Sequence, residues 1–237
     1  MKKSIICLVS LLCLALGFTS CEKKQSAGKT NITYYAEIVL NGDATMVVGK
    51  GTTFVDPGFK ATMKGEDVTD KVTVTSTVDT STSGIYSITY SIVNADGFLA
   101  STSRTVIVLD LTDPVEGFWE VTPTSFREYN GNKVEYGASF QILIIQEEPG
   151  IYYVDDLFAG WYCQRAGYGD AYSMEGYVGV AGDGTISLLA SKIAGWGDSL
   201  DALNDGKFDA TTKTITYQAV YNGGTMFFNV TLNKVDL

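Results

Sequence analysis

The chain has 237 residues, 45% of them hydrophobic, and its 27 acidic side chains outnumber 17 basic ones to give a net charge of −10. A chain this acidic lacks the basic stripe that nucleic-acid binding requires, so we expect no nucleic-acid partner. It has no histidine and only four cysteines, so the usual ligands of zinc, copper and haem are missing and we expect no metal and no cofactor.

The N-terminus carries the features of a secretory signal. Lys2 and Lys3 precede an apolar run at 5–18, which is shorter than the ~20 residues that span a bilayer as a helix. Cys21 follows this run after Thr-Ser and resembles the lipobox cysteine of bacterial lipoproteins. The resemblance implies a signal peptide at 1–20, lipid attachment at Cys21 and membrane anchoring through the N-terminal lipid. An ordinary secretory signal with an incidental cysteine is the alternative.

Removal of the signal would leave Cys163 as the single free thiol, so we expect no disulfide within the mature chain. Residues 21–33 are polar, contain lysine and show no apolar periodicity, which is typical of a flexible tether.

Residues 34–110 contain short runs rich in β-branched and aromatic residues, separated by turn sequences such as "NGD", "KGED" and "NADG". In "GIYSITYSIV" at 84–93 the large apolar residues alternate with Ser and Thr, which predicts one buried and one solvated face. Closely spaced strands without a helical stretch predict an antiparallel β-sandwich.

Four short motifs of this region resemble the bacterial immunoglobulin-like domain of surface proteins, which is found near the N-terminus of many Bacteroidetes lipoproteins. They are Asp56-Pro57-Gly58, Gly84-x-Tyr86, Asp96-Gly97 and Arg104-Thr105-Val106. The resemblance implies a structural role for Tyr86 through a corner hydrogen bond. It also implies a function in spacing or adhesion rather than catalysis.

The stretch "DLTDPVEG" at 110–117 marks a change in composition, and we take 111–116 as a linker. Residues 117–237 contain all three tryptophans and again alternate strands with turns. We predict a second antiparallel β domain there, either a barrel or a sandwich, so the fold class is all-β. The whole chain resembles Bacteroidetes cell-envelope lipoproteins of unknown function that place an Ig-like domain before a β-rich C-terminal domain.

Two hairpins of the second domain can be registered by matching apolar faces. The first pairs Ala219 with Met226, Tyr217 with Phe228 and Ile215 with Val230 around an Asn222-Gly223 loop. The second pairs Val180 with Ile186 and Val178 with Leu188 around the loop 182–184, in which Gly184 takes the left-handed position.

The stretch "FAGWYCQRAGYGDAY" at 158–172 combines rings, glycines and polar groups, and "AGWGDS" at 194–199 adds another glycine-flanked ring. If the two loops formed one cleft, their rings could stack on a sugar while polar groups bind its hydroxyls. Alternatively, Trp161, Tyr162 and Phe158 plug one end of the domain, with Cys163 as a small buried residue. The candidate ligand-binding residues are Trp161, Gln164, Arg165, Tyr168, Asp170, Tyr172, Trp196 and Asp198.

Catalysis is not expected, because a serine or cysteine nucleophile would lack histidine as its base. The carboxylates Asp155, Asp156, Glu147 and Glu148 could serve a glycosidase but follow no distinguishing pattern. "GDGT" and "NDGKFD" do not fit a calcium loop and are interpreted as turns. The sequence favours a non-enzymatic lipoprotein of the outer membrane, surface-exposed or facing the periplasm, that binds glycan with the Ig-like domain as spacer. A module that contacts another envelope protein and binds no sugar is the alternative.

Overall fold

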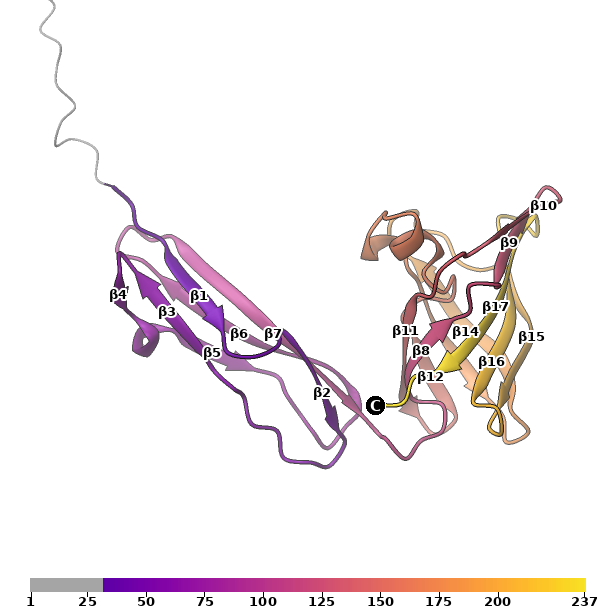
Figure 1. The fold of residues 1–237 in the computed structure, drawn as a ribbon, viewed down its shortest axis with the longest axis horizontal. Coiled ribbons are helices and arrows are strands. Elements are labelled where there is room, and N and C mark those ends of the chain that lie inside the picture. The colour runs from indigo at the N-terminus through magenta and orange to yellow at the C-terminus, as the bar shows by residue number, and fades with distance from the viewer. Residues whose placement is uncertain (1–31) are drawn as a thin grey trace, which may run out of the picture. The chain divides into compact units, whose positions relative to one another are not determined.

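The structure is a computed structural model that describes residues 32–237. The signal peptide, Cys21 and nearly all of the tether lie outside the described residues, so the predictions made for them stay predictions. The described chain is all-β, as predicted, with an Ig-like domain followed by a barrel-like sheet (Figure 1). No helix among residues 32–237 is long and apolar enough to cross a membrane.

Two sheets form the Ig-like domain. A three-stranded sheet has the order β1-β3-β4, and a four-stranded sheet has the order β2-β7-β6-β5, in which only the β2–β7 pair is parallel. Their apolar faces meet in a core that includes Ile88, Tyr90, Val106 and Val108. The strands are β1 (Ala36–Leu40), β2 (Thr45–Gly49), β3 (Phe59–Met63), β4 (Glu66–Asp67), β5 (Thr73–Ser76), β6 (Gly84–Val93) and β7 (Leu99–Leu109), with a 3₁₀ turn at Thr69–Lys71.

The alternation predicted for β6 is confirmed. Ile88, Tyr90 and Ile92 are buried, whereas Thr89 between them is exposed. The hydroxyl of Tyr86 donates a hydrogen bond to the carbonyl of Thr82 at 2.9 Å, which is the corner contact implied by the family resemblance.

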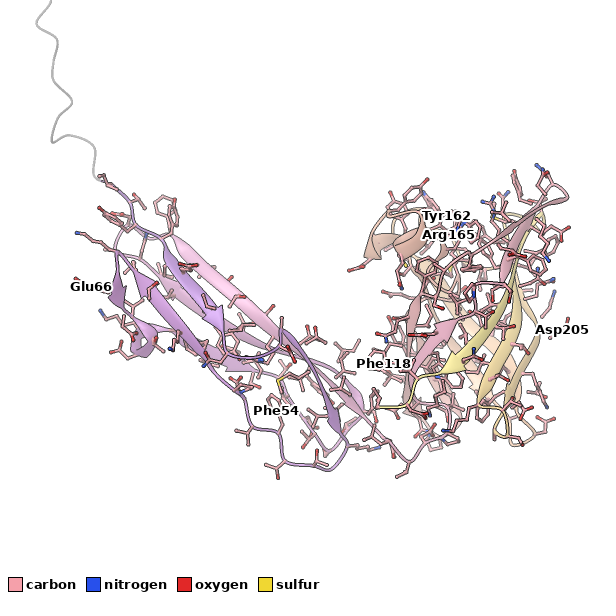
Figure 2. All side chains as sticks on the ribbon, viewed as in Figure 1. Phe54, Glu66, Phe118, Tyr162, Arg165 and Asp205 are labelled. Carbon is pink, nitrogen blue, oxygen red and sulfur yellow. The ribbon has the colours of Figure 1, made fainter. Side chains whose placement is uncertain are left out.

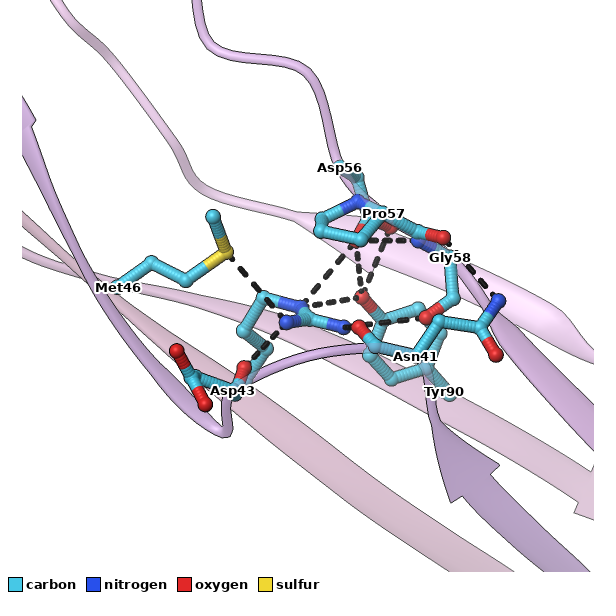
Figure 3. Close-up of polar contacts among 8 residues, drawn as sticks. Asn41, Asp43, Met46, Asp56, Pro57, Gly58 and Tyr90 are labelled. Atoms are coloured by element: carbon cyan, nitrogen blue, oxygen red, sulfur yellow. Dashed lines mark hydrogen bonds and ion pairs between the residues drawn. The ribbon is translucent and has the colours of Figure 1, made fainter.

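A fully buried arginine, Arg104 of β7, fastens the Asp56-Pro57-Gly58 turn to the sandwich (Figure 3). Its Nε lies 3.2 Å from the Asp56 carboxylate, and its Nη2 donates to the carbonyls of Asn41 and Gly58 at 2.8 and 3.1 Å. The Tyr90 hydroxyl donates to the same carboxylate at 2.8 Å. A buried guanidinium is tolerated because several acceptors and one opposite charge surround it.

The C-terminal domain is a closed antiparallel barrel, which decides between the two alternatives left by the sequence. Its strands run in the order β8-β11-β12-β13-β14-β15-β16-β17, and β17 pairs back with β8. The β9–β10 hairpin pairs with the first half of β17. The strands are β8 (Gly117–Val121), β9 (Phe126–Tyr129), β10 (Asn132–Glu135), β11 (Gln141–Glu148), β12 (Ile151–Val154), β13 (Met174–Val180), β14 (Thr185–Ile193), β15 (Ala202–Asp209), β16 (Thr214–Tyr221) and β17 (Met226–Lys234).

One of the two predicted hairpin registers is confirmed. Val180 pairs with Ile186 and Val178 with Leu188, and Gly184 takes a φ of 84°. The other register is wrong by two residues, because Ala219 pairs with Phe228 and Tyr221 with Met226. The faces stay as predicted, but the loop has four residues, of which Asn222, Gly223 and Gly224 all have positive φ.

Side chains fill the barrel interior, and one end of it is covered by the segment after β12. This cap contains a π-helical turn, η2 (Trp161–Arg165), and a 3₁₀ turn, η3 (Asp170–Tyr172), seen as coils at that end of the domain in Figure 1. Two core tyrosines fasten the cap. Tyr136 donates to the carbonyl of Phe158 at 2.7 Å, and Tyr217 donates to that of Leu157 at 3.1 Å.

Candidate functional site

Asp156, the second residue after β12, organises the cap from within. Its buried carboxylate accepts the backbone N–H groups of Phe158, Gly160 and Met174 at 2.8–2.9 Å and the thiol of Cys163 at 3.2 Å. Burial is the largest influence on its pKa, which is raised, while the N–H donors act in the opposite direction. One side chain therefore holds both ends of the cap.

The backbone before η2 depends on glycine. Ala159 and Gly160 have φ of 50° and 84°, so the chain turns through two consecutive left-handed residues. A Cβ on Gly160 would lie 2.5 Å from the Cβ of Phe140. Only glycine lets the cap approach Phe140, the residue before β11, this closely.

Trp161 is buried, with 3% of its surface exposed. Its indole meets Tyr136 edge-on at 4.9 Å and Phe228 at 6.0 Å, and the guanidinium carbons of Arg165 and Arg127 lie 4.2 and 4.9 Å from its centroid. Of the two alternatives left by the sequence, Trp161 therefore follows the buried plug and not the open cleft. Trp161 acts as a plug, together with the buried Phe158 and Cys163, because side chains from the barrel wall cover it.

Four other rings form the surface feature that we call the aromatic patch: Tyr162, Tyr168, Tyr172 and Trp196. Trp196 meets Tyr162, Tyr172 and Tyr168 at centroid distances of 4.8, 5.0 and 6.4 Å, all near edge-to-face. Tyr168 and Trp196 stay 55% and 41% exposed. The two glycine-flanked loops do meet, but through Tyr162 rather than Trp161.

Gly195 makes this meeting possible. A Cβ at that position would lie 2.7 Å from the ring of Tyr172, and the Gly195 N–H bonds to the carbonyl of Ala171 at 2.6 Å. The ring of Tyr172 thus packs directly on the backbone of the neighbouring loop.

The polar candidates divide by what they contact. Gln164 donates to the carbonyl of Gln141 at 2.8 Å, and Arg165 donates through Nε to that of Tyr136 at 3.0 Å. Asp198 accepts the hydroxyl of Tyr221 at 2.7 Å, which contributes with burial to a raised Tyr221 pKa. Asp170 is exposed at the start of η3.

A polar depression in the surface is lined in part by the residues that follow Trp196 in the sequence. It is lined by Gly197, Asp198, Ser199, Asp201, Tyr221, Asn222 and Gly223. Asp201 accepts the N–H of Gly224 at 3.0 Å and so ties this loop to the β16–β17 turn. Tyr221, Asp201 and Arg127 were not among the predicted site residues. Strands distant in the sequence, β16 and β9, bring Tyr221 and Arg127 to the loops, whereas Asp201 lies in the loop itself, just beyond the stretch 194–199.

The carboxylates considered for catalysis have structural partners. Asp156 holds the cap, and Asp155 accepts the N–H of Leu143 at 2.9 Å. Burial, the largest cause, raises the pKa of Asp155 to about 7, and the nearby charges of Asp156 and Glu175 add to the rise. These bonds give both groups a role in positioning the cap and β11.

Comparisons with known proteins agree with this architecture. The family model of the bacterial surface protein Ig-like domain matches residues 38–108, and a second family model, which describes a C-terminal domain, matches residues 109–234. No curated protein matches the chain.

Among solved structures, the lipoprotein BT2262 from Bacteroides thetaiotaomicron is 39% identical over 84% of this chain and all of that one, with a TM-score of 0.71. Two structures of ZmpB from Clostridium perfringens cover 50% of this chain. They are the CBM51-2 and INT domains with GlcNAc (18% identity, 31% of that chain, TM-score 0.27) and the M60 catalytic domain with CBM51-1 and CBM51-2 (19%, 15%, 0.26). At TM-scores this low neither shows a shared fold. The chain therefore belongs to the same family as the lipoprotein BT2262, as a bacterial surface Ig-like domain followed by that family's C-terminal domain.

Proposed function

We propose that the protein is a non-enzymatic lipoprotein of the outer membrane, anchored through Cys21, whose barrel binds glycan while the Ig-like domain acts as a spacer. The observation that carries the proposal is the aromatic patch, which leaves Tyr168 and Trp196 about half exposed on a cap fastened to a closed barrel.

Rings of this kind suit the C–H face of a sugar, because aromatic surface and apolar sugar hydrogens are both removed from water on contact. The adjoining depression adds the carboxylates of Asp198 and Asp201 and the hydroxyl of Tyr221 as partners for sugar hydroxyls. A cap already held by Asp156 and the core tyrosines need not be ordered on binding, which lowers the entropic cost of association.

The anchor is tested separately from the ligand. Replacing Cys21 by serine should abolish acylation and release the protein from the membrane fraction, whereas a lipid-labelled mutant would contradict the proposal. Protease accessibility on intact cells distinguishes surface display from a periplasmic orientation, since only Glu22 supplies an acidic residue before Lys23 and Lys24.

The ligand is tested with the soluble chain from residue 22 onward on a broad glycan array and in affinity gels. Trp196→Ala should weaken binding by about tenfold or more, because a central aromatic contact is typically worth more than 1 kcal/mol. Tyr177→Ala is the matched control, since Tyr177 has the same 41% exposure but lies on β13. Absence of binding across the panel would overturn the glycan proposal and favour a protein-interaction module.

A further inference from the structure

Two arginines at the capped end of the barrel have no carboxylate partner. Within residues 32–237 neither Arg127 nor Arg165 takes part in an ion pair, in contrast to Arg104 with Asp56 and Lys213 with Asp236. In a chain with 27 acidic side chains and a net charge of −10, two unpaired guanidinium groups beside one indole are unexpected.

Arg127 lies on the inward face of β9. It stands opposite Phe228, a fully buried core residue, whereas the adjacent Glu128 points to the other face. Its Nε is buried and has no hydrogen-bond partner, and its terminal nitrogens make no hydrogen bond within residues 32–237. The terminal nitrogens of Arg127 therefore keep hydrogen-bonding capacity for a ligand.

Arg165 approaches the same indole from η2. Its Nε is engaged by the carbonyl of Tyr136, while the side chain as a whole is exposed. Figure 2 labels Arg165 and Tyr162 at the capped end of the barrel. Only one of its donors has a protein partner, so the terminal nitrogens keep hydrogen-bonding capacity for a ligand.

We infer that Arg127 and Arg165 bind the carboxylate or sulfate group of an acidic saccharide. This inference rests on the proposed glycan function and narrows its substrate class. Guanidinium donors match the oxygens of such groups in a planar fork, and the resulting bonds are stronger than those between neutral groups.

The two guanidinium groups are continuous with the aromatic patch. Both guanidinium groups lie at the ring of Trp161, and the next residue, Tyr162, meets Trp196 at 4.8 Å. An acidic group at the arginines would therefore place the neighbouring sugar rings over the exposed surfaces of Tyr168 and Trp196. Asp198, the acidic candidate beside Trp196, is bonded to Tyr221.

Three oligosaccharide probes of similar length test the inference on the soluble chain from residue 22 onward. They are oligogalacturonate, which carries carboxylates, sulfated galactan, which carries sulfates, and neutral galactan. Calorimetry should show at least one acidic probe binding about tenfold or more tighter than the neutral one. The acidic probe that binds identifies the group.

Arg165→Gln should remove most of this preference and leave the affinity for neutral galactan unchanged. Arg165→Lys keeps the charge but loses the planar fork of donors, so its preference for the acidic probe should lie between those of the wild type and Arg165→Gln. Lys133→Gln is the control. Lys133 packs on Phe126 at 3.7 Å and stands opposite Glu128 in the β9–β10 pairing, so it lies on the face of the hairpin away from Arg127.

Equal binding of acidic and neutral probes, or an equal loss on both in Arg165→Gln, would overturn the acidic-group site and leave the glycan proposal standing. Binding of no saccharide by the wild type would overturn both. Arg127→Gln gives an independent measurement, with thermal melting used to separate a loss of preference from a loss of folding.

Discussion

The cost of emptying the Trp161 site measures whether this residue closes the barrel or belongs to a binding surface. A buried tryptophan side chain removes roughly 150–250 Å² from water, and each Å² stabilises the fold by ~25 cal/mol. Trp161 is almost completely buried, with 3% of its surface exposed. Trp161→Ala should therefore lower the unfolding free energy by about 4 kcal/mol, within the usual ~3–5 kcal/mol range. Loss of the two guanidinium contacts adds to this cost.

Trp196→Ala is the matched comparison: because Trp196 is 41% exposed, the same area calculation gives a cost of about 2 kcal/mol, roughly half that of Trp161→Ala. Urea unfolding followed by tryptophan fluorescence reports on the barrel alone, since Trp119, Trp161 and Trp196 all lie after residue 117. A loss below about 1.5 kcal/mol for Trp161→Ala, or a larger loss for Trp196→Ala, would refute the assignment of Trp161 to the core.

Three further changes test other parts of the structure. Because the folded-state pKa of Asp155 is raised to about 7, its ionisation removes stability as pH rises from ~4 through 7. Asp155→Asn should make melting less dependent on pH in that window and raise the Tm at pH 8, and an unchanged profile would contradict this. Asp56→Asn should destabilise the Ig-like domain by up to about 3 kcal/mol by leaving Arg104 without its counter-charge, as measured by denaturation. Asp43→Asn should leave the stability unchanged, because Arg104 bonds to the backbone carbonyl of Asp43 and not to its side chain. Gly160→Ala should cost more than Gly167→Ala in a thermal melt. Both residues have positive φ, but a Cβ would clash only at Gly160.

Local patterns in the sequence predicted the strands and their buried faces, but they could not fix everything about pairing. In the β16–β17 hairpin the alternation predicted which side chains share a face, and these faces are correct. A shift of two residues preserves that alternation, so the pattern could not distinguish a two-residue loop from the observed four-residue one. The run Asn222-Gly223-Gly224 allowed both, because each residue tolerates a left-handed conformation.

The candidate site could be predicted only where neighbours in the sequence are also neighbours in space. Three of the rings of 158–172 reach the aromatic patch. The burial of Trp161 depends on Arg127 and Phe228, which β9 and β17 deliver from elsewhere in the barrel. Closure of β17 onto β8 is likewise a long-range pairing, so a barrel could not be told from a sandwich.

The buried plug and the aromatic patch are formed by consecutive residues of one turn. In η2, Trp161 packs into the core while Tyr162 meets Trp196 at the surface. Ordering a free side chain at an interface costs ~0.5–1.5 kcal/mol. Tyr162 avoids much of this cost, because Trp161 and Asp156 already hold the turn that carries it. A mutation that loosens the plug should therefore lower the affinity of the aromatic patch for a ligand, even though the mutated residue does not contact that ligand. Cys163→Ala tests this coupling, since it removes the thiol bond to Asp156 and changes no ring of the aromatic patch. A lower Tm without a change in glycan affinity would show that the plug and the aromatic patch are independent.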